Sequence, residues 1–137
     1  MKKRNKIIMK NIPFGKPVID KNVVPKIKKI LNSGKLVHGV YQKNFEKIFS
    51  KLNKSPYVTT VTNCTSGMLL YYMSKKLKKG DEVIVPATTH VATAHAIEAT
   101  GAKPVFVDVN IENGSINLDE AKKKITSKTK GLVIVHY

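Results

Sequence analysis

Residues 62–67, with the sequence TNCTSG, are a run of small polar side chains that could hold an anion. A β-branched run at 58–61 predicts a short buried strand before them, and an apolar stretch at 68–77 predicts a helix after them. A strand, a polar turn and a helix direct several backbone N–H groups toward one point, where the helix dipole adds partial positive charge. With the hydroxyls of Thr65 and Ser66 as further donors, the pattern is typical of a phosphate site. The alternative is an ordinary helix N-cap, because Thr, Asn and Ser commonly cap helices.

A second turn, at 87–90, follows the next expected strand, at 82–85, and carries His90. In open α/β sheets ligands bind beyond the carboxyl ends of the strands, and both turns are expected there. The imidazole of His90 could therefore lie flat against a ring held by the first turn. The alternative is a surface histidine in the first turn of a helix.

The other candidate groups lack partners at a spacing that chemistry requires. Cys64 is the only cysteine, and His90 and His95 are five residues apart, whereas two zinc-binding histidines on one helix face are four apart. Cys64 is therefore expected to fill space in the turn, and no metal site is expected. The sequence contains neither GxGxxG nor a GxxxxGK loop, which argues against the usual dinucleotide and nucleoside-triphosphate sites. No catalytic role is assigned to the remaining candidates, which are His38, Asp108 and His136.

Length and composition indicate one domain's worth of globular chain with an unusual charge. The 137 residues are 42% hydrophobic, and 25 basic against 9 acidic residues give a formal net charge of +16. One alternative function is therefore a noncatalytic basic α/β module with nonspecific nucleic-acid affinity. All basic residues except Arg4 are lysines scattered along the chain, which favours solvated helix faces over specific nucleic-acid recognition. The single cysteine and the absence of long apolar stretches predict a cytoplasmic protein.

The first 56 residues are expected to form a flexible basic arm (1–11) followed by N-terminal helices (12–56) that pack on the rest of the protein. Prolines and a glycine at 12–18 favour an extended run. Asp20 or Asn22 can cap a first helix that ends at Gly34. The apolar stripes of the two helices comprise Val23, Val24, Ile27, Ile30 and Leu31 in the first, and Phe45, Ile48, Phe49 and Leu52 in the second.

Residues 57–137 alternate short apolar strands with helices. Further strands are expected at 104–109 and 131–136. A helix capped by Thr88 or Thr89 is expected to end at Gly101, and Asn117 with Glu120 forms a capping box for another helix. Continuous apolar strands that alternate with helices predict an α/β fold with a mainly parallel sheet covered on both faces. Because the last strand reaches the end of the chain, we expect the N-terminal portion of a larger, here incomplete, domain.

Four segments resemble the N-terminal part of the DegT family: SGKLVHG (33–39), VTNCTSGMLL (61–70), the block at 80–109, and TKGLVIVHY (129–137). Members of this family are pyridoxal-phosphate-dependent aminotransferases that act on nucleotide-linked keto-sugars, typically with glutamate as the amino donor. The resemblance implies the start of the large, cofactor-binding domain of the aspartate aminotransferase fold (fold type I). For the full enzyme it implies a homodimer with a role in nucleotide-sugar and polysaccharide biosynthesis.

The resemblance also assigns cofactor-binding roles to Cys64, Thr65, Ser66 and His90. Thr65 and Ser66 match the turn whose backbone and hydroxyls hold the cofactor phosphate, and His90 matches a position that stacks on the pyridine ring. Relatives often have Gly-Thr-Ala where this chain has Cys64-Thr65-Ser66. Gly39 and its neighbours resemble a segment near the dimer interface and the mouth of the active site.

In such enzymes a lysine holds the cofactor aldehyde as a Schiff base and an aspartate pairs with the pyridine nitrogen, and both would lie beyond Tyr137. No lysine of this chain sits in a matching motif. The chain alone is therefore expected to be inactive and to bind pyridoxal phosphate weakly at best. It could be a fragment, a half that assembles with a separately encoded C-terminal half, or a nonfunctional truncated product. A parent enzyme without the lysine would be a dehydratase-type relative.

Overall fold

The computed structural model describes residue 13 and residues 15–136. The chain forms two compact units, Met1–Val58 and Thr59–Tyr137. The basic arm expected at 1–11 lies outside the described residues.

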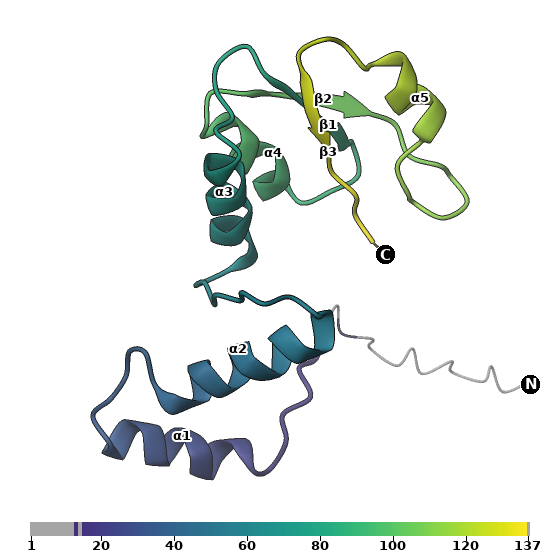
Figure 1. Cartoon of the computed structure of the whole chain (residues 1–137). Helices are drawn as coiled ribbons and strands as arrows, with labels where there is room; N and C mark the ends of the chain where they lie inside the picture. Colours follow the sequence, from purple (N-terminus) through teal and green to yellow (C-terminus); the bar gives the residue numbers. More distant parts are fainter. Residues whose placement is uncertain (1–12, 14, 137) are drawn as a thin grey trace, which may run out of the picture. The chain divides into compact units, whose positions relative to one another are not determined.

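The first unit contains the two predicted amphipathic helices, α1 (Val23–Asn32) and α2 (Val40–Asn53), joined by the turn at 33–39 (Figure 1). Asn22 occupies the N-cap of α1 without a side-chain bond to the helix, while its own N–H donates to Asp20 Oδ1 at 2.7 Å. Gly34 has a φ of +65° and takes the chain out of the helix, as predicted. Neither helix has a buried residue, so the apolar stripes predicted from the sequence are present but uncovered within this unit.

The second unit is built on a three-stranded parallel sheet with the strand order β2-β1-β3 (Figure 1). This confirms the predicted α/β fold with a parallel sheet. In the central strand, β1, Ile84 lies opposite Val105 of β2 on one side and opposite Leu132 of β3 on the other. The elements of this unit in chain order are α3 (Cys64–Ser74), β1 (Glu82–Pro86), α4 (Val91–Glu98), β2 (Lys103–Val107), α5 (Leu118–Lys123) and β3 (Thr129–Leu132).

Successive side chains of β1 point to opposite faces of the sheet, and helices cover both (Figure 1). Val83 and Val85 pack on one face against a cluster from α3 and α4 that includes Tyr72 and Ile97. Ile84 packs on the other face with Val107, Ile116 and Ala121 of α5. The pKa of the Tyr72 hydroxyl is raised, mainly because the side chain is buried in this cluster and to a smaller extent because Tyr71 lies beside it. The prediction of helices on both faces is therefore confirmed for this sheet.

The prediction of a strand at 58–61 is wrong for the described structure. These residues pair with none of the three strands, and the side chain of Val61 is 40% exposed. A β-branched run sets only a preference for the extended backbone, and a strand forms where a neighbour supplies hydrogen bonds.

The last strand also differs from its prediction, because β3 ends at Leu132 and is only partly buried. The Val133 N–H still donates to the Ile84 carbonyl at 2.9 Å. The next rung of this parallel ladder would need the N–H of Pro86, which proline lacks. Residues 134–136 therefore leave the sheet instead of extending it.

Two other boundaries shift for local reasons. The strand predicted at 104–109 ends at Val107, and Val109 instead forms an isolated antiparallel bridge with Ile116. The capping box at Asn117 is half formed: Asn117 Oδ1 accepts from the N–H groups of Asp119 and Glu120, both at 3.1 Å. The Glu120 carboxylate pairs with the Lys123 ammonium instead of completing the box, which raises the pKa of that lysine.

Candidate cofactor-binding site

The turn expected at 62–67 is mostly the first turn of α3, because that helix begins at Cys64 and not at Met68. Asn63 is the reason, since its side-chain oxygen accepts from the Ser66 N–H at 2.8 Å. The Gly67 N–H makes the first backbone bond of the helix, to the Asn63 carbonyl at 3.2 Å. The N–H groups of Cys64 and Thr65 have no acceptor one turn earlier within the helix, so they remain available to an anion.

The side chains around these amides are all neutral donors or acceptors. Ser66 Oγ lies 3.1 Å from Thr62 Oγ1, which fixes one hydroxyl against the other. Thr65 and Cys64 are exposed, and the Cys64 thiol is free. No acidic residue occupies the first turn of α3. The arrangement is therefore both an ordinary N-cap at Asn63 and an uncrowded cluster of N–H and O–H groups, so the two interpretations of the sequence coexist.

His90 is the N-cap of α4, a position that the sequence analysis gave to Thr88 or Thr89. His90 Nδ1 accepts from the Ala92 N–H at 3.1 Å. Thr89 Oγ1 instead lies 2.9 Å from Thr93 Oγ1. The cap fixes the imidazole orientation, and a neutral ring that accepts at Nδ1 carries its proton on Nε2. The ring is exposed and can offer its face to a ligand.

The two helix N-termini lie at the same end of one layer. α3 and α4 run side by side on one face of the sheet and start at the same end of the pair (Figure 1). The β1 strand leads through 87–90 directly into α4, as the sequence predicted, whereas the segment before α3 is not a strand. The packing of α3 against α4 therefore places Cys64, Thr65 and Ser66 at the same end as His90, and both helix dipoles point their positive ends there.

The other candidates take structural or separate positions. Asp108 Oδ1 accepts from the Val109 N–H at 2.8 Å, which stabilises the loop after β2. His95 lies in the last turn of α4, away from the N-terminus. Among residues 13 and 15–136, no group of three or more His, Cys, Asp or Glu side chains could hold a metal ion. Within the same residues, no helix combines the length and the apolar character needed to cross a membrane.

Sequence reasoning allowed an N-cap within 62–67 without choosing Asn63, and it assigned the cap of α4 to Thr88 or Thr89 instead of His90. Asn is among the most favoured N-cap residues, and Asn63 lies three residues before Ser66, so its position was a usable signal. His90 gave no comparable signal, because Thr88 and Thr89 are better caps by residue type. The local backbone, which puts Nδ1 within reach of the Ala92 N–H, decided between them.

Comparison with known proteins assigns the chain to a family. The DegT/DnrJ/EryC1/StrS aminotransferase family profile matches residues 17–137. The chain belongs to this family. The expected resemblance is therefore confirmed over almost the whole chain.

Individual relatives are similar in sequence and in fold. GDP-perosamine synthase of Escherichia coli O157:H7 is 36% identical over 129 residues, which cover 93% of this chain and 35% of the synthase. Spr1654 of Streptococcus pneumoniae, in its PMP form, is 31% identical with a TM-score of 0.84, covering 91% of this chain and 32% of Spr1654. The E. coli GDP-4-keto-6-deoxy-D-mannose-3-dehydratase with bound hydrated PLP is 29% identical with a TM-score of 0.81, covering 90% and 33%.

These similarities confirm the aminotransferase fold for this DegT-family chain. The chain spans about a third of the length of the relatives it matches.

Proposed function

We propose that this DegT-family chain is the N-terminal segment of a pyridoxal-phosphate-dependent aminotransferase that transfers an amino group, from glutamate, to a nucleotide-linked keto-sugar. The observation that carries the proposal is the shared end of α3 and α4, where open amides and hydroxyls lie at the same end as an oriented imidazole. The family assignment and the relatives named after GDP-linked sugars support the same conclusion.

The donors at the start of α3 suit the phosphate of the cofactor. The N–H groups of Cys64 and Thr65 and the Thr65 hydroxyl would bind its oxygens, and the Ser66 hydroxyl, held by Thr62, would add a further donor. The absence of acidic residues from this first turn removes a source of repulsion for a dianion. When bound, the cofactor supplies the electron sink that amino transfer requires.

His90 would orient the cofactor ring. Its Nδ1 accepts a hydrogen bond from the Ala92 N–H, which holds the imidazole at the α4 N-terminus. The face of the imidazole would then pack against the pyridine ring of the cofactor. The Nε2 N–H remains as a donor toward bound groups. His90 is therefore proposed as a binding and positioning residue of this segment.

The phosphate assignment can be tested with pyridoxamine 5′-phosphate, which carries an amine and forms no imine with the many lysines of the chain. We expect the double variant Thr65→Val, Ser66→Ala to bind it roughly tenfold more weakly, because two hydroxyl contacts to a charged group are lost. The matched control is Ser74→Ala at the other end of α3, whose hydroxyl donates to the Tyr71 carbonyl. Equal affinity in all three proteins, measured by calorimetry, would contradict the assignment.

We also infer that the 137-residue chain does not transaminate by itself, because the family's cofactor-anchoring lysine matches none of its positions. The purified chain, incubated with pyridoxal phosphate and glutamate, should produce no more pyridoxamine phosphate than a lysine-rich control protein. A turnover rate above that background would overturn this inference.

A second reaction is possible for the whole enzyme, because one structural relative of similar TM-score is a sugar dehydratase. The residue at the cofactor-anchoring position of the whole enzyme decides between the two reactions. A lysine there supports the aminotransferase, and another residue supports the dehydratase.

A further inference from the structure

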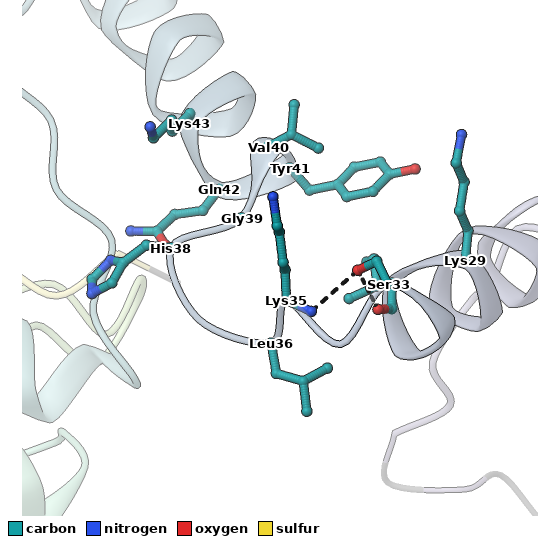
Figure 2. Close-up of a pocket in the computed structure, with 11 residues that line it drawn as sticks. Lys29, Ser33, Lys35, Leu36, His38, Gly39, Val40, Tyr41, Gln42 and Lys43 are labelled. Atoms are coloured by element: carbon teal, nitrogen blue, oxygen red, sulfur yellow. Dashed lines mark hydrogen bonds between the residues drawn. The ribbon is translucent and has the colours of Figure 1, made fainter.

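The corner between α1 and α2 contains a cavity of about 670 Å³, which belongs entirely to the first unit (Figure 2). It lies between the last turn of α1 and the first turn of α2, is bordered by the 33–39 turn and is open to solvent. Ligand sites for small molecules typically measure about 300–1,000 Å³. The cavity is therefore large enough for a nucleotide and far larger than an inorganic phosphate needs.

The lining of this cavity is positively charged. Lys29, Lys35 and Lys43 are among the residues that line it, and no Asp or Glu is. Figure 2 shows the Lys35 side chain reaching toward the start of α2, beside Gly39 and Tyr41. Three lysines, with no carboxylate among the lining residues themselves, favour a multiply charged anion.

The backbone adds donors on the same side. Gly39 is the N-cap of α2 and has no side chain to bond the helix, and the first backbone bond runs from the Lys43 N–H to the Gly39 carbonyl at 3.3 Å. The N–H groups of residues 40–42 therefore have no acceptor within the helix. The Gln42 side chain does not reach back to them, since it donates to Glu46 Oε1 at 3.1 Å.

The cavity also offers an apolar and aromatic surface. Ile30 and Leu36 line it, and Tyr41, whose side chain is 41% exposed, extends its ring between Lys29 and Lys35 (Figure 2). An aromatic ring beside ammonium groups suits a base joined to phosphates, because every base has a face that can stack. An anion without a ring would leave this part of the cavity unused.

We propose that the α1–α2 cavity binds the nucleoside diphosphate part of the nucleotide-linked sugar. Its phosphates contact the ammonium groups of Lys29 and Lys35 and the amides at the start of α2, and its base packs on Tyr41. The proposal rests on the proposed function for the class of substrate, and it assigns the recognition of the nucleotide to residues outside the candidate cofactor site.

The test titrates the 137-residue chain with GDP by calorimetry in the absence of any pyridoxal compound, so its failure leaves the cofactor assignment untouched. The double variant Lys29→Gln, Lys35→Gln should weaken GDP binding about tenfold, since two partly exposed charge contacts are lost. The control Lys26→Gln, Lys47→Gln removes the same charge from α1 and α2 outside the cavity, and should stay within about twofold. Equal weakening in both variants means general attraction of polyanions to a +16 chain and overturns the proposal.

A second variant tests the base. Tyr41→Leu should weaken binding of GDP and leave binding of pyrophosphate unchanged, because only GDP has a ring to stack. If Tyr41→Leu leaves GDP binding unchanged, the cavity holds phosphate groups alone and the nucleotide proposal is wrong. Far-UV circular dichroism of every variant, compared with the parent, identifies any that has lost helix, and such a variant is replaced by the corresponding Lys→Met or Tyr→Met exchange.

Discussion

Both units contain helices that carry apolar side chains, but the two units bury these side chains to different degrees. In the second unit Val85 and Ile97 are fully buried between the sheet and its helices. In the first unit neither α1 nor α2 has a buried residue, and Leu52 remains 76% exposed. An apolar stripe in the sequence therefore identifies the face of a helix that needs a packing partner, but it does not show that the partner is present. In the second unit the sheet is the partner of α3 and α4.

The largest expected effect contrasts one isoleucine from each unit. Ile97→Ala should lower the free energy of unfolding by about 2–5 kcal/mol, because it leaves a cavity in a fully enclosed position. Ile48→Ala, at a side chain that is 67% exposed, should cost about 0.5 kcal/mol or less. Urea unfolding of both variants measures the difference, and similar losses would remove the distinction between the units.

Glycine gives the next contrast. Gly101 has a φ of +84°, and a Cβ there would lie 3.3 Å from the Lys79 backbone nitrogen. Gly101→Ala should therefore destabilise the second unit by about 1–3 kcal/mol. Gly15, in the first unit, has nothing within 4 Å of an added Cβ and no positive φ, so Gly15→Ala is the control and should be neutral. Thermal unfolding curves compare the two, and a neutral Gly101→Ala would contradict the turn geometry.

Gly67 should behave in the opposite way. It lies inside α3 without a positive φ, and an added Cβ would meet only Val61 Cγ2, at 3.4 Å. Gly67→Ala should therefore stabilise the helix by about 0.5–1 kcal/mol. If the first turn of α3 also approaches a phosphate, the same variant should lose affinity for pyridoxamine phosphate, which calorimetry detects. A stable variant with unchanged affinity would show that the ligand keeps its distance from this turn.

The smallest expected effect concerns alkaline pH. Burial raises the pKa of Tyr72 above its ordinary value, so the protonated hydroxyl is favoured in the folded state. Its contribution to stability is fully present below the ordinary pKa of about 10 and is lost as the pH rises through the raised value. Tyr72→Phe should therefore lose less stability than the parent between pH 9 and 11. Tyr57→Phe, at a side chain that is 89% exposed, should follow the parent, and a parallel loss in all three proteins would exclude a role for Tyr72.

The elements that sequence reasoning placed best are those with a strong local signal. Apolar periodicity located α1 and α2, and the run at 82–85 located β1, whose neighbours bury it on both faces. The run at 58–61 is also rich in β-branched residues but forms no strand. β-Propensity favours an extended backbone and does not by itself provide a neighbouring strand to pair with. The end of β3 depended on Pro86, a residue of another strand, which no local pattern around 131–136 could reveal.

The candidate site follows the same division. The sequence located the donors at Thr65 and Ser66 and the imidazole of His90, since residue types after a strand-like run carry that signal. It did not locate the start of α3, although Asn63 is a favoured N-cap residue type, and it did not locate the cap at His90, which depends on backbone geometry. The α1–α2 cavity was invisible to it, since Lys29 and Tyr41 approach one another only through the turn between the helices.

The most direct test of the central claim maps backbone amide shifts by NMR while pyridoxamine 5′-phosphate is added to the 137-residue chain, with pyridoxamine as the control. We expect the amide signals of Cys64, Thr65 and Ser66 to shift strongly with the phosphorylated compound and hardly with pyridoxamine, and the His90 ring signals to shift with both. Unchanged signals at Cys64 to Ser66, with shifts confined to lysine-rich surfaces elsewhere, would contradict it.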